Sequence, residues 1–343
     1  MKTVGLDIGG ANIKYATDSG AANSVAFPLW RTPEELTGCL ENLCRSLLPA
    51  NALAVTMTGE LCDAFASKSE GVHFILESLL RAVRAVAPTP PPVHVWTTEG
   101  HWLPPEEALA DPLAVAAANW LAVAMYAARY SENEPALLVD VGSTTTDIIP
   151  LDRGVPIPHG RDDTSRLLSG ELIYTGVSRT PIGMLVDELP HQDTSCPIAR
   201  EVFATTLDAY LLLEKIAEDP NNTATADGRS ATRELARARM ARMLCVDPSN
   251  YKDEDAHAGA QAVHRAQMRL LTKAFDQVCS YLPDPPSTTI VSGSGEFLAH
   301  VLAAGQSRIV SLTDELGPKR SETACAFALA KLLQEKNSSE SRK

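Results

Sequence analysis

Two short stretches of the sequence combine an aspartate, glycine and small polar residues at nearly the same spacing. The first, DIGGANIK, begins at Asp7, and the second, DVGSTTTD, begins at Asp140. Glycine leaves the backbone unobstructed, so successive N–H groups can converge on the oxygens of a phosphate. A carboxylate beside phosphate oxygens calls for a cation between them, and Mg²⁺ accepts both kinds of oxygen. A single turn of this kind is more often capped by its own aspartate, but the repetition predicts a site for a phosphate-bearing ligand.

Each residue of the two turns has an expected role. We expect Asp7 and Asp140 to bind Mg²⁺, directly or through water. Asp147 closes the second turn and either caps it, binds the metal or acts as a general base. Lys14 either reaches a phosphate or is a solvated strand residue. The expected phosphate-binding residues offer free amides, hydroxyl groups, an amide side chain and one ammonium group: Gly9, Gly10, Asn12, Lys14, Gly142, Ser143, Thr144 and Thr145.

A third glycine-rich turn leads from an apolar strand directly into a helix. In SGSGEF, Gly293 and Gly295 precede Glu296. A helix that begins at such a turn offers free amides and the positive end of its dipole to an anion or a ribose. We therefore expect Gly293 and Gly295 to bind phosphate and Glu296 to contact substrate, although turns of this kind are also common as plain connections.

Two further segments supply candidate catalytic and substrate residues. TMTGE ends a buried strand at Glu60, at the end of the sheet where α/β proteins usually bind ligands. Glu60 is therefore the alternative candidate for the general base. It could equally be a glutamate that caps a helix. The segment GELIYTGVSRTPI is rich in polar and turn residues, and Tyr174, Ser178, Arg179 and Thr180 are expected to line the mouth of a cleft. Arg179 either binds an anionic group or forms an ordinary surface ion pair.

The elements that carry these turns alternate between strands and helices, which is typical of an α/β fold. The first half has expected strands at residues 3–7, 13–17, 24–30, 52–56 and 93–97 and helices at 33–48, 64–86 and 112–130. The pattern then restarts, with strands at 137–141, 145–151, 155–158, 288–292 and 308–312 and helices from 295 and over 322–334. The polar segment SENEP lies between the halves, which predicts domains at 1–132 and 133–343. Residues from about 198 to 281 are expected to form a mostly helical insertion in the second domain. The last helix is expected to pack back on the first domain. The tail EKNSSESRK is expected to be frayed.

Composition narrows the class of protein. The chain has 343 residues, of which 43 are acidic and 30 basic, giving a formal charge of -13. This charge disfavours nucleic acid as a partner, because neutralising phosphates needs a surface rich in Lys and Arg. The seven scattered cysteines and the absence of a signal-peptide pattern predict a cytoplasmic protein. The apolar run at 112–128 is too short to span a bilayer and predicts a buried helix, so we expect no membrane partner.

The three turns, in this order and spacing, resemble the two phosphate motifs and the adenosine motif of the superfamily that includes actin, sugar kinases, heat-shock chaperones and the hydantoinase/oxoprolinase proteins. GLDIGGANIKYA, TMTGELCD, AAANWLA, LLVDVGSTTTDIIPL and GELIYTGVSRTPI together resemble the hydantoinase/oxoprolinase-type proteins linked to the tetrahydromethanopterin one-carbon pathway. The resemblance covers nearly the whole chain. It implies two actin-like (ribonuclease H-like) domains around a central cleft, with a mostly helical insertion in the second.

The same resemblance implies an activity in methanofuran or methylofuran biosynthesis. An aryl ether synthase of this kind joins an aminomethylfuran diphosphate to a tyramine- or tyrosine-type phenol and releases diphosphate, with Mg²⁺ as cofactor. Arg179 would then bind the diphosphate or a glutamyl carboxylate of the substrate. Two alternatives stay open: an ATP-dependent small-molecule kinase or oxoprolinase-like ATPase, with ATP as cofactor, and a nucleotide-binding regulator without enzymatic activity. The expected partners are small-molecule substrates, and the oligomeric state considered is a homodimer.

Overall fold

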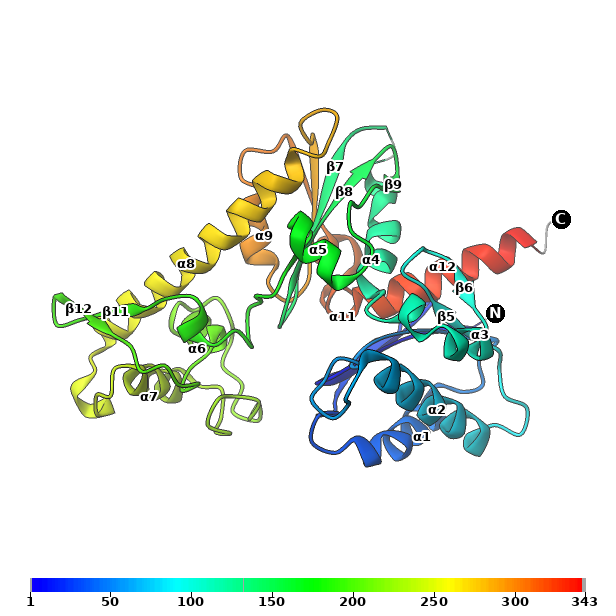
Figure 1. Cartoon of the computed structure of the whole chain (residues 1–343), viewed down its shortest axis with the longest axis horizontal. Coiled ribbons are helices and arrows are strands. Elements are labelled where there is room, and N and C mark those ends of the chain that lie inside the picture. Colours follow the sequence, from blue (N-terminus) through cyan, green and yellow to red (C-terminus); the bar gives the residue numbers. More distant parts are fainter. Residues whose placement is uncertain (1, 132, 341–343) are drawn as a thin grey trace.

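The computed structural model describes residues 2–131 and 133–340, which form two halves, each built on a mixed sheet (Figure 1). The sheet of the first half has the order β3-β2-β1-β4-β5-β6. The first three strands pair antiparallel, and β4 and β5 extend the sheet in parallel with β1. The strands are β1 (Thr3–Gly9), β2 (Asn12–Thr17), β3 (Ala22–Ala26), β4 (Ala52–Thr58), β5 (Val93–Trp96) and β6 (Trp102–Leu103).

The sheet of the second half repeats this plan. Its order is β10-β8-β7-β13-β14, with β9 pairing β8 at the side. Again the leading pair β7 and β8 is antiparallel, and β13 and β14 continue in parallel with β7. These strands are β7 (Ala136–Val141), β8 (Thr146–Asp152), β9 (Val155–Pro156), β10 (Leu172–Ile173), β13 (Thr288–Ser292) and β14 (Arg308–Ser311). The repeated strand order places the two aspartate turns at equivalent points of the two sheets.

Helices cover both faces of the first sheet. Leu6 and Val55 belong to the core shared with α1 (Leu36–Leu47) and α2 (Lys68–Val86). The opposite face carries small residues such as Ala16 and Ala54, which lie in one core with α4 (Asn119–Ala127) and α12 (Ala324–Glu340). A Cβ on Gly5 would lie 1.8 Å from the Ala326 carbonyl oxygen, so only glycine lets α12 pack this closely on β1. The helices α3 (Pro105–Ala110), α5 (Asp163–Ser169), α9 (Glu296–Leu302), α10 (Leu312–Leu316) and α11 (Pro318–Glu322) complete the two halves.

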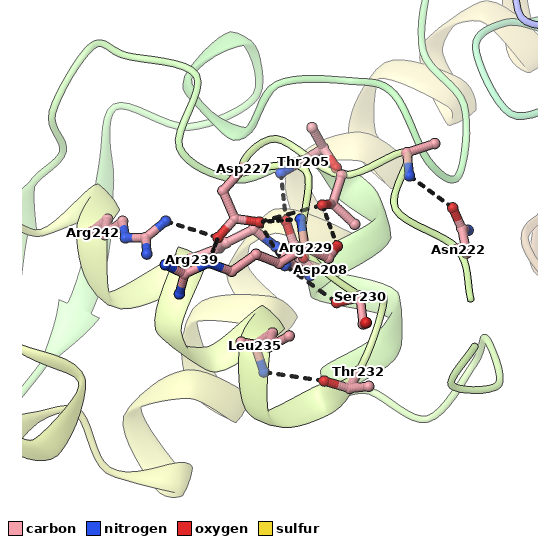
Figure 2. A network of polar contacts seen from close by, with 12 residues as sticks. Thr205, Asp208, Asn222, Asp227, Arg229, Ser230, Thr232, Leu235, Arg239 and Arg242 are labelled. Carbon is pink, nitrogen blue, oxygen red and sulfur yellow. Dashed lines mark hydrogen bonds and ion pairs between the residues drawn. The ribbon is translucent and has the colours of Figure 1, made fainter. Parts of the chain in front are cut away.

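Residues between β10 and β13 form a lobe that projects away from the second sheet (Figure 1). It contains the hairpin β11 (Glu188–His191) and β12 (Thr194–Pro197), followed by α6 (Thr206–Leu212), α7 (Arg233–Met243) and the 27-residue α8 (Asp253–Cys279). Figure 2 shows how buried charges tie the lobe together: Arg239 of α7 donates to Asp208 of α6 at 2.7 Å and to Asp227 at 3.1 Å. Arg242 also donates to Asp227 at 2.9 Å, so the loop before α7 is fastened to that helix.

Three expectations about elements were wrong. The strand expected at 24–30 ends at Ala26, because Pro28 lacks the N–H that a strand needs. The helix expected at 112–130 is broken into η2 (Pro112–Val115), α4 and η3 (Ala128–Tyr130), with Ala117 between them at φ 50°. The tail expected to be frayed is helical as far as Glu340, and residues 341–343 lie outside the described part. The hairpin β11–β12 was not predicted.

Within residues 2–131 and 133–340, no helix is both long enough and apolar enough to cross a bilayer.

Candidate active site

A cleft of about 570 Å³ lies between the two sheets and is lined by residues of both halves. Both aspartate turns open into it. The residues it brings together from our sequence predictions are Asp7, Gly9, Gly10, Asn12, Lys14, Glu60, Asp140, Gly142, Ser143, Thr144, Thr145, Asp147, Tyr174 and Arg179. Residues separated by more than 150 positions in the sequence therefore face one common space.

The first turn places a buried carboxylate on the floor of the cleft. Asp7 lies near the end of β1, opposite Lys14 of β2 in the strand register. Burial raises the pKa of the Asp7 carboxyl, and the charge of Lys14 together with hydrogen bonds from Cys325 and Thr58 opposes the rise. Asp7 Oδ1 is buried and has no hydrogen-bond partner in the described structure. An unpaired carboxylate oxygen of this kind is suited to a cation.

The second turn mirrors the first. Asp140 lies at the end of β7, and the Asp140 carboxyl has its pKa raised to about 6 by burial and by the neighbouring charge of Asp147, while Lys14 opposes the rise. The carbonyl oxygens of Gly142 and Ser143 accept hydrogen bonds from the segment that follows β10. Within the described chain, the N–H groups of Ser143 and Thr144 donate no hydrogen bond, so they remain free to bind an anion.

Asp147 is engaged in a buried ion pair that the sequence analysis missed. Its Oδ1 accepts a hydrogen bond from Nη2 of Arg166 at 2.6 Å, and both side chains are buried. The Arg166 guanidinium also lies 4.1 Å from the ring centroid of Trp120, which belongs to α4 of the first half. Although burial raises the pKa of Asp147, Arg166 opposes the rise by charge and hydrogen bonding. Asp147 therefore has a partner already, which makes it a poor candidate for accepting a proton.

Glu60 has the properties that a general base needs. It lies just after β4, is 1% exposed, and its Oε2 has no hydrogen-bond partner in the described structure. Burial raises the pKa of Glu60 to about 7, helped by the charges of Asp163 and Asp7 and opposed by Lys68. Its backbone packs against α2 at Gly71, where a Cβ would lie 2.4 Å from the Glu60 carbonyl oxygen. The glycine in the helix thus fixes the position of the turn that presents this carboxyl to the cleft.

The two halves also meet through an ion pair near the cleft. Nζ of Lys68, the first residue of α2, lies 2.5 Å from Oδ2 of Asp163, the first residue of α5. Asp163 lines the cleft, and both charges act on the pKa of Glu60. This pair therefore joins the two walls beside the candidate base.

The third glycine turn does not line the cleft. Gly293, Gly295 and Glu296 follow β13, and the Gly295 N–H donates to the Val141 carbonyl at 2.8 Å. A Cβ on Gly293 would lie 2.6 Å from Asp140 Oδ1, so the turn packs against the second aspartate hairpin. Oε1 of Glu296 accepts a hydrogen bond from the Thr313 N–H at 3.4 Å. Ser178 and Thr180 do not line the cleft either, although Arg179 between them does. The Ser178 N–H donates to the Ser143 carbonyl, and the buried Thr180 hydroxyl accepts from the Gly176 N–H.

Sequence reasoning missed several residues of the cleft. Arg166 and Asp163 lie in a short polar helix that carries no motif, and their partners are 19 and 95 positions away. Trp30 was placed in a strand that ends four residues earlier. The one available signal was Pro28, since proline inside an apolar run argues against a continuous strand.

Mg²⁺ fits the residues of the cleft only if other ligands complete its shell. Asp7 and Asp140 supply two carboxylates, and Asp7 Oδ1 is without a partner. No group of three His, Cys, Asp or Glu side chains in residues 2–131 and 133–340 is arranged to hold a metal. Mg²⁺ commonly uses one or two carboxylates together with waters and substrate phosphate oxygens, so the arrangement is compatible with such an ion.

Comparison with known proteins gives matches over nearly the whole chain. The sequence profile described as hydantoinase/oxoprolinase matches residues 51–336. A protein of Methanocaldococcus jannaschii named (4-{4-[2-(gamma-L-glutamylamino)ethyl]phenoxymethyl}furan-2-yl)methanamine synthase is 31% identical over 334 residues, covering 96% of this chain and 97% of that protein. The protein of the same name from Methanococcus vannielii is 29% identical over 203 residues, covering 58% of this chain and 90% of that protein.

Solved structures support the fold. A nucleotide-free structure of acetone carboxylase matches with a TM-score of 0.54 at 10% identity, covering 96% of this chain and 70% of that chain. At this identity the likeness concerns the fold alone. Together with the repeated strand order of the two sheets, it confirms the predicted class of two actin-like domains around a cleft.

Proposed function

Because the chain belongs to the hydantoinase/oxoprolinase family, as its profile match and its 31% identity to a full-length relative show, we propose that it is a synthase of the kind its relatives are named for. It forms a phenoxymethyl ether between a furan methanamine and a tyramine- or tyrosine-type phenol. We further propose that the furan enters as a diphosphate ester and that diphosphate is the leaving group.

One observation carries the proposal: both aspartate turns line the same cleft as the buried carboxyl of Glu60, whose Oε2 has no hydrogen-bond partner in the described structure. The free N–H groups of Ser143 and Thr144, the hydroxyl groups beside them and the ammonium of Lys14 suit the several oxygens of a diphosphate. The turn that would serve a nucleoside, at Gly293 and Gly295, lies outside the cleft lining. These features favour a substrate that brings its own diphosphate over one that is phosphorylated by ATP.

The reaction requires one proton to move and one carbon–oxygen bond to be exchanged. The carboxylate of Glu60 accepts the proton of the phenol hydroxyl, and the phenol oxygen forms a bond to the methylene carbon of the furan. The bond from that carbon to the diphosphate oxygen breaks, and the electron pair leaves with diphosphate. With a pKa of about 7, Glu60 is a stronger base than an ordinary glutamate and is still ionised in a large fraction of molecules at neutral pH.

The other residues of the cleft act on the leaving group. Mg²⁺ held by Asp7 and Asp140 would neutralise charge on the diphosphate. Lys14 and the amides of the second turn add donors that are already oriented before the reaction, which is how an enzyme stabilises charge that develops on a leaving group. Arg166 pairs with Asp147 and so balances the charge of one of the several carboxylates that line the cleft.

The test is an incubation of the protein with an aminomethylfuran diphosphate and γ-glutamyltyramine or tyrosine, with and without Mg²⁺, and a parallel incubation with ATP. We expect an aryl ether and an equal amount of diphosphate, identified by mass, and no consumption of ATP. We also expect Mg·diphosphate to bind more tightly than Mg·ADP in calorimetry. Phosphate release from ATP, with tight Mg·ADP binding and no ether, would instead identify an ATP-dependent kinase or hydrolase.

A further inference from the structure

We propose that Trp30 and Leu61 form the subsite for the aromatic ring of the acceptor, an inference that rests on the proposed function. The ligand class is a neutral phenol whose ring packs on these two side chains. Both residues lie in the first half and both line the cleft.

Their exposure is the first observation. Trp30 is 40% exposed and Leu61 is 53% exposed, whereas Trp96 and Trp120 are buried. Leaving large apolar side chains in water forgoes the free energy that burial would provide, and each is covered when an apolar ligand binds. Most other first-half side chains of the cleft are charged, polar or small, so these two offer its main apolar surface on that wall.

The second observation is that Trp30 is held in place. The N–H groups of Phe27 and Leu29 donate to the carbonyl oxygens of Ala11 and Gly10, both at 2.9 Å, which fixes the segment before Trp30 against the first aspartate turn. The Arg31 guanidinium carbon lies 4.4 Å from the Trp30 ring centroid and covers part of the ring. A ring in a fixed position is a better platform for stacking than a freely rotating one, because less side-chain entropy is lost when the ligand binds.

The third observation is the position of this surface relative to the candidate base. Leu61 directly follows Glu60, and a Cβ on Gly59 would lie 2.7 Å from a methyl carbon of Leu29. The turn that carries Glu60 therefore packs on the same segment that presents Trp30. We place the phenol ring on Trp30 and Leu61 with its hydroxyl toward the Glu60 carboxyl, and the turns proposed to bind diphosphate line the same cleft. Ring stacking and apolar contact can thus orient the acceptor without using any of the charged groups.

The experiment compares Trp30→Ala and Leu61→Ala with Leu113→Ala. Leu113 is a matched control, because it is also an exposed leucine of the first half, at 60%, but does not line the cleft. The steady-state KM for N-acetyltyramine is measured at saturating furan diphosphate, and its Kd is measured by calorimetry. We expect KM and Kd to rise about tenfold in Trp30→Ala and about threefold in Leu61→Ala, the scale of losing one stacked ring or one aliphatic contact. The Kd for Mg·diphosphate should stay unchanged in all three variants.

The outcomes separate this inference from the proposed function. If the wild type makes the ether but both cleft variants keep the KM and Kd of Leu113→Ala, the subsite is refuted and the function stands. If the variants lose diphosphate binding as strongly as phenol binding, their effect is on the whole cleft and the subsite is likewise refuted. If the wild type makes the ether from γ-glutamyltyramine but neither binds N-acetyltyramine nor converts it, the subsite is refuted and the function stands, whereas no ether from any of these phenols refutes the proposed function and the subsite with it.

Discussion

Replacing Glu60 by glutamine should stabilise the protein at high pH while removing activity. The wild-type carboxyl is 1% exposed and its pKa is raised to about 7 from an ordinary value of 4.5. The native state therefore holds the proton more tightly than the unfolded chain does. Stability from this group is fully present below pH 4.5 and is lost as the pH rises through about 7, because the native protein must then bury a charge. Glutamine carries no charge and has nearly the same shape.

The expected magnitude follows from the two pKa values. At pH 8 the raised pKa lowers the unfolding free energy by about 3 kcal/mol, because the native state buries a charge. At pH 5 it lowers it by about 1 kcal/mol, because the native state keeps a proton that the unfolded chain largely releases. The difference in unfolding free energy between Glu60→Gln and wild type should thus grow by roughly 2 kcal/mol from pH 5 to pH 8. Other buried carboxyls also titrate in this range, but they are common to both proteins and largely cancel in the comparison.

Urea unfolding at several pH values, followed by circular dichroism, measures this difference. Glu34→Gln serves as the control, because Glu34 is an exposed glutamate of the same half, and its difference from wild type should stay within about 0.5 kcal/mol at every pH. A difference for Glu60→Gln that is constant with pH, or that shrinks as the pH rises, would show that Glu60 is ionised at little cost. The argument for Glu60 as a base with a raised pKa would then be wrong.

Three further predictions follow from the site and the lobe. In the wild type, kcat/KM for ether formation should rise with pH with an apparent pKa near 7, since Glu60 must be ionised, and the residual activity of Glu60→Gln should lack this rise. Asp7→Asn and Asp140→Asn should fold normally, lose about 10²-fold or more in kcat, and need more Mg²⁺; near-normal turnover at unchanged Mg²⁺ dependence would contradict the metal assignment. Asp208→Asn should lower the unfolding free energy by about 1.5–3 kcal/mol, because it removes the charge of the closer of the two carboxylates that the buried Arg239 contacts, whereas Asp187→Asn, in an exposed pair, should change it by less than about 1 kcal/mol.

The position of the aspartate turns could be predicted from the sequence because the residues of each turn are close together along the chain. Asp7 and Lys14, or Asp140 and Thr144, belong to one hairpin, so spacing along the chain already determines how they lie relative to one another. The antiparallel pairs β1–β2 and β7–β8 are local in the same way, because consecutive strands usually pair, whereas the pairing of β1 with β4 and of β7 with β13 joins distant segments. The same local pattern was insufficient for the turn at Gly293: its shape follows from the glycines, but whether it faces the cleft depends on how β13 and α9 pack on the second sheet.

Other features depend on contacts between distant segments. Arg166 has no motif around it, and its importance arises from Asp147 on one side and the Trp120 ring on the other. In the sequence, Trp30 looks like an ordinary strand residue. In the structure the strand ends at Ala26, and the segment that follows hydrogen-bonds to the first aspartate turn, which brings Trp30 to the cleft. Choosing between Asp147 and Glu60 as the base also required the fold, because only the partner of each carboxyl distinguishes them.

The position of α12 determines when the first half can finish folding during translation. β1 is made before every other described element, yet α12, which packs on the face carrying Gly5, Ala16 and Ala54, is made after all of them. Among the described helices, that face of the first sheet therefore has only α4 to pack on it until the second half has been synthesised. The two halves are consequently unable to fold completely as separate fragments. Cutting the chain between β6 and β7 would leave the N-terminal fragment without α12 on its sheet, and the C-terminal fragment would carry α12 without the sheet that it packs on. Nascent-chain proteolysis should find the first sheet resistant only after α12 has emerged.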